Sequence, residues 1–97
     1  MGMRIFADVP GFEWDDGNQE KILKKHGLPS EECEEVFQDE GRQFFEDIYH
    51  SGNEARYVVI GKTQQGKLLF VAFTIRKSNV RIISARPVNR KEKTLYE

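Results

Sequence analysis

The chain has 97 residues, 38% hydrophobic and 32% charged, which excludes a disordered polymer and leaves room for one domain over residues 1–97, with residues 1–11 as a lead-in segment. No window approaches the roughly 20 apolar residues of a membrane span, and the first residues lack the apolar stretch and cleavage site of a signal peptide. The single cysteine, Cys33, excludes an internal disulfide and a cysteine zinc cluster, so we expect a cytoplasmic protein.

The net charge of −1 conceals an uneven distribution of charge along the chain. Residues 1–50 carry 13 acidic and 5 basic side chains, a net charge of −8, whereas residues 51–97 carry 3 acidic and 10 basic ones, a net charge of +7. Such asymmetry is typical of a protein whose basic half faces a polyanion. A sheet edged with solvated Lys and Arg side chains would give the same pattern, so charge alone does not decide.

The N-terminal half predicts an edge strand followed by a helix. The apolar segment 12–14 suits the strand, and either Asp15 or Asp16 can cap the helix by accepting a hydrogen bond from a free amide. The helix is expected to run to about His26. Gly27 then occupies the position where a left-handed C-terminal cap is expected.

A second short helix is predicted to begin at Ser30, which we expect to be its N-cap. Glu31 and Glu32 would lie favourably at the positive end of the helix dipole. The segment 39–41 ends this helix. Its buried stripe would consist of Cys33, Val36 and Phe37.

Strands dominate the rest of the chain. A weak strand is expected at residues 43–47, and strong strands are expected at residues 56–62, 67–76 and 80–86, joined by tight turns. The charged residues 88–97 could form a final helix. The predicted fold class is therefore α+β: two N-terminal helices packed on a mainly antiparallel sheet of four to five strands, with a short C-terminal helix.

The register of the two hairpins sorts the strand residues into two faces, if Lys62 closes on Lys67 and Arg76 closes on Val80. The helix-covered face would hold Val58, Ile60, Leu69, Val71, Phe73, Ile83 and Ala85, with Arg56 and Arg81 near its margin. The open face would hold Tyr57, Val59, Leu68, Phe70, Ala72, Thr74, Arg76, Ile82, Ser84 and Arg86. Arg76 and Arg86 are therefore the better candidates for contact with phosphate.

No metal site or cofactor site is indicated. Two histidines and one cysteine give no ligand spacing for zinc, and the acidic residues do not match a calcium loop. The dipeptide Gly66-Lys67 lacks the preceding glycine pattern of a phosphate-binding loop. We therefore expect neither a metal nor a cofactor.

Cationic and imidazole side chains remain, and both suit RNA. A guanidinium group offers a planar fork of donors to phosphate oxygens, and only His26 and His50 have an unperturbed pKa suited to acid–base work near neutrality. Metal-free cleavage needs a base for the 2′-hydroxyl and cations for the charge that develops on phosphorus. The candidate catalytic residues are His26, His50, Arg56, Arg76, Arg81 and Arg86. The candidate RNA-binding residues are Lys25, Tyr57, Lys62, Lys67, Thr74, Ser84, Arg90, Lys91 and Lys93.

Structural roles are the alternative for each candidate. Arg56 and Arg81 could pair with carboxylates such as Glu13 or Glu54 at the sheet edge. His26 could merely cap and pack the end of its helix, and His50 could be an ordinary loop residue.

Short motifs follow one another in an order typical of a known family. The first are the segments 12–15, 25–27 and 35–37, and the middle ones are 50–51, Glu54-x-Arg56-Tyr57, 60–61 and 66–71. The last are Thr74-x-Arg76, the segment 81–86 and Glu92-x-x-x-Tyr96-Glu97. Over residues 12–97 the chain thereby resembles the BrnT family of ribonuclease toxins.

This resemblance implies a fold similar to that of RelE-type ribonucleases and an RNA cleavage activity that arrests translation. It also implies a BrnA-like antitoxin that carries a DNA-binding segment, covers the basic face of the toxin and dimerises into a two-plus-two complex. That complex would repress its own operon, so DNA would be contacted only through the antitoxin, and no membrane is involved.

Three positions depart from the family pattern. The family has Lys and Asn in the first helix where this chain has Asn18 and Ile22, and an acidic residue where it has Ile75. Ile22 and Ile75 favour an alternative, a catalytically degenerate toxin-like module that binds an antitoxin or RNA without cleaving. A DNA-binding regulator acting alone is a weaker third candidate, because nothing resembles a recognition helix with basic residues on one face.

Overall fold

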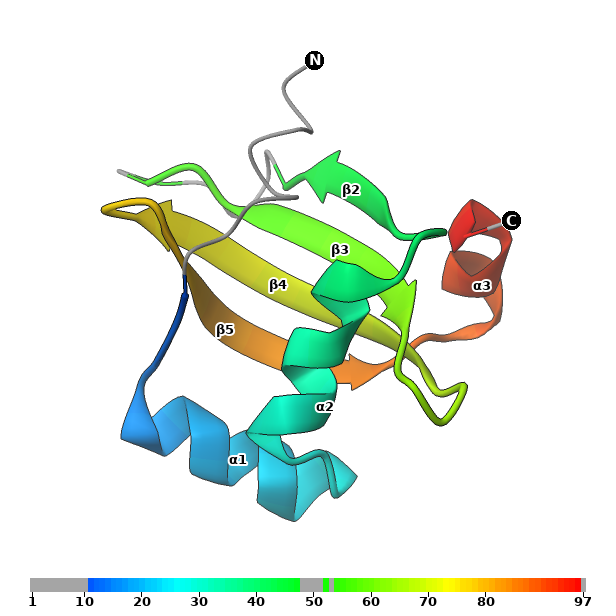
Figure 1. The fold of residues 1–97 in the computed structure, drawn as a ribbon, viewed down its shortest axis with the longest axis horizontal. Coiled ribbons are helices and arrows are strands. Elements are labelled where there is room, and N and C mark those ends of the chain that lie inside the picture. Colours follow the sequence, from blue (N-terminus) through cyan, green and yellow to red (C-terminus); the bar gives the residue numbers. More distant parts are fainter. Residues whose placement is uncertain (1–10, 48–51, 53, 97) are drawn as a thin grey trace.

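The computed structural model describes residues 11–47, 52 and 54–96. Its elements are β1 (Phe12–Trp14), α1 (Asp16–His26), α2 (Ser30–Glu35), the 3-10 turn η2 (Val36–Gln38), β2 (Gln43–Glu46), β3 (Tyr57–Lys62), β4 (Leu68–Arg76), β5 (Asn79–Pro87) and α3 (Arg90–Tyr96). The five strands form one sheet in the order β1-β5-β4-β3-β2. Helices α1 and α2 cover one face of the sheet, and α3 lies beside the ends of β2 and β3 (Figure 1). The predicted α+β fold is confirmed.

The sheet is mixed, because the edge strand β1 runs parallel to β5 while every other pair is antiparallel. Phe12 pairs with Val80, and Trp14 pairs with Ile82. The indole nitrogen of Trp14 donates a hydrogen bond of 2.7 Å to a carboxylate oxygen of Glu34. This bond ties the edge strand to α2.

Local capping explains where α1 begins and ends. Asp15 is its N-cap and accepts a hydrogen bond of 2.8 Å from the Gly17 amide. Gly27 has a left-handed backbone with φ 65°, and its amide donates to the Leu23 carbonyl. Both predicted caps are confirmed. Glycine suits the C-terminal cap because a residue without a Cβ adopts the left-handed backbone at little cost.

The predicted N-cap of α2 is wrong by one residue. Pro29, in an extended conformation, is the N-cap, and its carbonyl accepts hydrogen bonds from the amides of Glu32 and Cys33. Ser30 is already helical, and its hydroxyl donates to the Glu31 carboxylate at 3.4 Å. Proline has no backbone N–H but keeps its carbonyl, so it can accept the first hydrogen bonds of a helix from the N-cap position.

The main hydrophobic core lies between the sheet and the two N-terminal helices. The Phe37 ring packs edge-on against the rings of Phe12 and Phe73, with centroids 5.3 and 5.0 Å apart. Cys33 and Val36 are completely buried beside them, as predicted. Burial and neighbouring carboxylates raise the pKa of the Cys33 thiol to about 12. Cys33 is therefore a core residue and is protonated at neutral pH.

The predicted register is wrong by one residue in both hairpins. Lys62 pairs with Leu68, and Arg76 pairs with Asn79. The turn between β4 and β5 consists of only two residues, Lys77 and Ser78, which both have positive φ angles and so fit a tight hairpin turn. The slip exchanges the faces of β3: Val59 and Tyr57 join the main core, whereas Val58 and Ile60 join a second apolar cluster.

A β-bulge in β5 changes which of its residues face the main core. Ala72 pairs with Ser84 and Phe73 pairs with Ile82, so that Ile83 is the additional residue. As a result Ile82, and not Ile83, is part of the main core, while Ala85 lies there as predicted. The prediction also placed Arg81 at the core margin. The observed register places it opposite Thr74, on the open face.

Candidate functional site

A pocket of about 340 Å³ opens between α1 and β5. Four of the predicted site residues line it: Lys25 and His26 from α1, and Ser84 and Arg86 from β5. The other lining residues are Asn18, Lys21, Ile22, Ile83 and Ala85. Among the described residues, no acidic side chain contributes to the lining. The pocket therefore combines cations, an imidazole and a hydroxyl, which is a suitable set for binding phosphate.

The short edge strand explains why the pocket exists. Strand β1 pairs only with residues 80–82 of β5, so α1 rather than a strand lies beside the rest of that edge. The bulge occurs at Ile83, and Ile83 lines the pocket. Lys25 and His26 lie in the last turn of α1, where the negative end of the helix dipole favours cations whether or not they have a function.

Arg86 lines the pocket, and its guanidinium is held by a residue of α3. Its Nη1 and Nη2 atoms donate to the two carboxylate oxygens of Glu92 at 2.8 and 2.6 Å, and its guanidinium lies 4.3 Å from the centre of the Phe70 ring. Hydrogen bonding to Glu92 raises the pKa of Arg86, and the same contact lowers the pKa of Glu92. Glu92 also forms a reciprocal cap with Asn89, because each side chain accepts from the other residue's amide. The orientation of Arg86 is therefore coupled to the start of α3.

A second group of predicted residues lies at the turn between β4 and β5. Arg76 donates to both carboxylate oxygens of Glu54 at 2.8 and 2.9 Å, and this contact lowers the pKa of Glu54. Arg81 approaches Asp15 at 3.7 Å. The Thr74 hydroxyl is buried and donates to a backbone carbonyl. None of these residues lines the pocket beside α1.

The remaining candidates are scattered. Tyr57 packs against Phe73 at the margin of the main core, Lys67 pairs with Glu32 at 2.9 Å, and the Lys62 ammonium lies over the Tyr96 ring. Arg90, Lys91 and Lys93 are exposed on α3. Arg56 is half-buried before β3. His50 lies outside the described residues.

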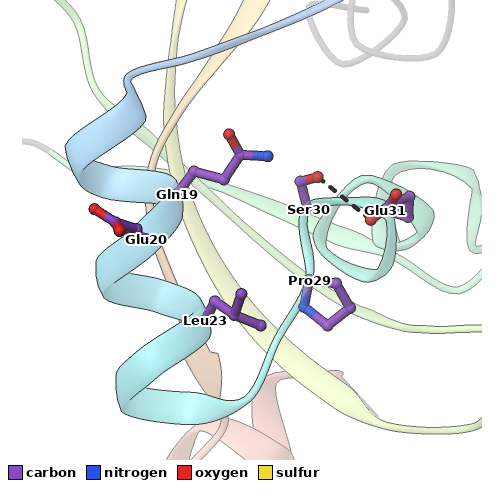
Figure 2. A pocket seen from close by; sticks show the side chains of 6 residues that line it. All are labelled: Gln19, Glu20, Leu23, Pro29, Ser30 and Glu31. Carbon is purple, nitrogen blue, oxygen red and sulfur yellow. Dashed lines mark hydrogen bonds between the residues drawn. The ribbon is translucent and has the colours of Figure 1, made fainter.

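Another pocket, of about 490 Å³, lies between α1 and α2. Figure 2 shows Gln19 and Leu23 of α1 pointing toward Ser30 and Pro29 at the start of α2. It contains none of the predicted site residues, and its carboxylates, from Glu20 and Glu31, would repel a polyanion. Helix α1 therefore separates an acidic pocket from a basic one.

Two lining residues of the basic pocket, Asn18 and Lys21, were not predicted as site residues. Their positions relative to Lys25 put all three on one side of a helix, and this spacing could have identified them. Ile22 lines the same pocket and is also buried in the core. Ile75, the third departure from the family pattern, packs against the core from β4.

Within residues 11–47, 52 and 54–96, no three His, Cys, Asp or Glu side chains lie close enough together to hold a metal ion. No described helix is both long and apolar enough to cross a membrane.

The fold and the pocket together define a small α+β protein with a cationic site beside an edge of its sheet. The family model described as the ribonuclease toxin BrnT of type II toxin–antitoxin systems matches residues 14–92, so the chain belongs to the BrnT family. The resemblance noted in the sequence is thereby confirmed. Membership implies an RNA substrate and an antitoxin partner.

A solved structure shows the same fold. The crystal structure of the Brucella abortus ribonuclease toxin BrnT aligns with a TM-score of 0.62 at 20% sequence identity, covering 82% of this chain and 97% of that one. No curated protein sequence matches the chain.

Proposed function

We propose that this chain is an endoribonuclease that cleaves RNA without a metal ion in the pocket between α1 and β5, and that it thereby inhibits translation. The observation that carries the proposal is the convergence of His26, Lys25, Ser84 and Arg86 on one pocket, from elements far apart in the sequence. An imidazole beside several cations supplies both groups that metal-free cleavage needs.

In the proposed reaction His26 accepts the proton of a ribose 2′-hydroxyl. The 2′-oxygen then forms a bond to the adjacent phosphorus, and the bond from phosphorus to the 5′-oxygen of the next nucleotide breaks. The products are a 2′,3′-cyclic phosphate and a 5′-hydroxyl, whose oxygen takes its proton from water, and His26 then releases its own proton to the hydroxide that is left. Lys25 and Arg86 would stabilise the negative charge that develops on the phosphate oxygens.

Within a type II system, we propose that the partner is a BrnA-like antitoxin with a DNA-binding segment. It would cover the basic pocket and dimerise into a two-plus-two complex in the cytoplasm. DNA would be bound by that complex and not by the toxin alone. Family membership and the cationic pocket support this arrangement.

A specific observation favours a second candidate, the module that binds without cleaving. Arg86 and Arg76, the two arginines preferred for phosphate contact, each form a two-pronged ion pair with a carboxylate. A guanidinium held in this way has fewer donors available for a substrate. This candidate predicts strong binding of RNA or antitoxin, intact RNA and normal growth on expression.

Incubating the purified protein with single-stranded RNA and a chelator separates the two. We expect cleavage by the wild-type protein, and a loss on the order of 100-fold or more in the cleavage rate for His26→Asn and Arg86→Ala, because each removes a group acting on the reacting atoms. Lys24→Gln is the control, since Lys24 is exposed on α1 and does not line the pocket.

Expression in cells should arrest growth for the wild type and Lys24→Gln but not for the two pocket variants. RNA left intact by the wild type, with no growth arrest, would refute the enzyme and support the binding module. Cleavage that disappears on chelation would refute metal independence alone.

A further inference from the structure

Two lysines on the pocket side of α1 lie one helical turn apart. Lys21 and Lys25 both line the pocket, and their separation of four residues places them next to each other on the helix surface. Like charges at this spacing destabilise a helix, because the two side chains are neighbours on the same face and repel each other. Both side chains are exposed, so the repulsion is small, and an anion bound in the pocket would relieve it.

The described part of the chain does not provide a counter-charge for this pair. The residues one turn away from Lys21 on α1 are Gly17, Asn18, Lys24 and Lys25, none of which is acidic. Neither Lys21 nor Lys25 forms an ion pair with a described residue. The helix dipole favours Lys25 in the last turn, but Lys21 lies before that turn.

Lys24 differs from both although it lies between them. Glu20 precedes it by four residues, which is the favourable order for an acid–base pair on a helix. Lys24 is exposed like the other two, but it does not line the pocket. It is therefore a matched control on the same helix with the same charge.

The other fixed cation of the pocket is already neutralised. Both terminal nitrogens of Arg86 donate to the carboxylate of Glu92, whose side chain is only 14% exposed. The uncompensated positive charge of the pocket therefore comes from α1.

We propose that Lys21 is a phosphate-binding residue of this pocket, and that Lys21 and Lys25, rather than Arg86, supply the net charge that attracts the RNA backbone. The inference deepens the proposed function and rests on it for the identity of the ligand. An ammonium on a flexible stem acts as a point charge, so the pair can follow a phosphate without a fixed geometry. Arg86 would then act on the reacting phosphate from a fixed orientation and not as the main source of attraction.

The test measures binding without cleavage. A single-stranded RNA carrying 2′-O-methyl groups has no nucleophile, so its dissociation constant can be measured over a series of salt concentrations. Each phosphate contact to a single strand contributes about 0.7 to the slope of log affinity against log salt. We expect Lys21→Gln and Lys25→Gln each to lower the slope by about 0.7 relative to the wild type. Lys24→Gln should leave it unchanged, and Lys21→Arg should retain the wild-type slope.

Thermal unfolding of each variant checks that the fold is intact. A slope for Lys21→Gln equal to that of Lys24→Gln would overturn the proposal, as would a wild type that does not bind the methylated RNA. Cleavage of unmodified RNA is measured in parallel. Binding with a Lys21-dependent slope but no cleavage would refute the enzyme and support this inference, whereas cleavage with unchanged slopes would refute this inference alone.

Discussion

Arginines that look equivalent in the sequence have different surroundings in the structure. Arg76 pairs with Glu54, and both side chains are about half exposed, so water screens the pair and it contributes little to stability. Arg86 pairs with a largely buried Glu92 and stacks on Phe70. A guanidinium held from two directions has a defined orientation. Of these two arginines, Arg86 is therefore the one better placed to act on a substrate with fixed geometry.

The Tyr96 phenol provides a test at the scale of one residue. It donates a hydrogen bond of 2.6 Å to the Asp39 carboxylate, and this bond raises the pKa of Tyr96 to about 12. We expect Asp39→Asn to lower the Tyr96 pKa toward about 10, the ordinary value, because the charged acceptor is lost. Ultraviolet absorbance titration of the phenol measures it, and Tyr96→Phe identifies the step that belongs to this residue. A wild-type protein without that high-pH step would contradict the assignment.

The hydrogen bond between Tyr96 and Asp39 makes the stability of the fold depend on pH. A raised phenol pKa means that the stabilisation is complete below the ordinary tyrosine pKa and is lost as the pH rises through about 12. Partial burial opposes ionisation of Asp39, but hydrogen bonds from Tyr96 and from the Lys62 and Gly41 amides outweigh it and lower the Asp39 pKa. The contribution of Asp39 is therefore present above the ordinary aspartate pKa and is lost as the pH falls through the lowered one.

At the scale of elements, the sequence predicts those features that depend on residues close together in the chain. The caps of α1 depend on Asp15 and Gly27, which act within a few residues of their own positions, and both were recognised. The register of β3 was predicted wrongly, because Val58, Val59 and Ile60 are all buried. No alternation of apolar and polar residues shows which face each one joins. A strand with two apolar faces leaves its register to the turns and to pairing with its neighbours.

The site was predictable to a similar extent. Lys25 and His26 were found from their place at a helix end, and Arg86 from its place in a basic strand. That they meet depends on α1 lying along the uncovered edge of β5, which no single segment encodes. Arg76 was expected to contact phosphate, but in the structure it pairs with Glu54. That partner lies 22 residues away in the sequence, so the local pattern does not reveal it.

Close packing of η2 on β3 depends on a glycine. A Cβ at Gly61 would lie 2.8 Å from the Val36 carbonyl oxygen and 3.1 Å from the Val36 Cβ. We expect Gly61→Ala to lower the free energy of unfolding by about 1–3 kcal/mol, because backbone must shift to admit the methyl group. Urea denaturation measures the change.

Gly52→Ala is the comparison for that experiment, since a methyl group there meets nothing within 4 Å. Equal denaturation midpoints for the two variants would show that η2 moves aside without strain.

At the scale of the whole molecule, the net charges of the two halves of the sequence do not show where the site lies. The basic pocket joins α1, from the acidic half of the chain, to β5, from the basic half. The acidic and basic sides of α1 are only one helix width apart. Folding therefore redistributes the charge that the sequence separates.

Protection of backbone amides should follow the layout of the sheet. Strand β4 pairs along both of its edges, and Leu69, Val71 and Phe73 are completely buried. Helix α3 has no buried residue among those described. We expect hydrogen–deuterium exchange to be slowest in β4 and the adjoining parts of β3 and β5, and much faster in α3, because local opening costs least where few apolar contacts are lost. Exchange in α3 as slow as in β4 would contradict this order.

The parallel pairing of β1 with β5 has a consequence for synthesis. Residues 12–14 emerge from the ribosome before their partners at 80–82, which follow only after helices α1 and α2 and strands β2 to β4. Such distant pairing delays folding until both partners are available. The pocket needs α1 and Arg86 together, so an incomplete nascent chain has no pocket. The site can therefore assemble only after both segments have left the ribosome.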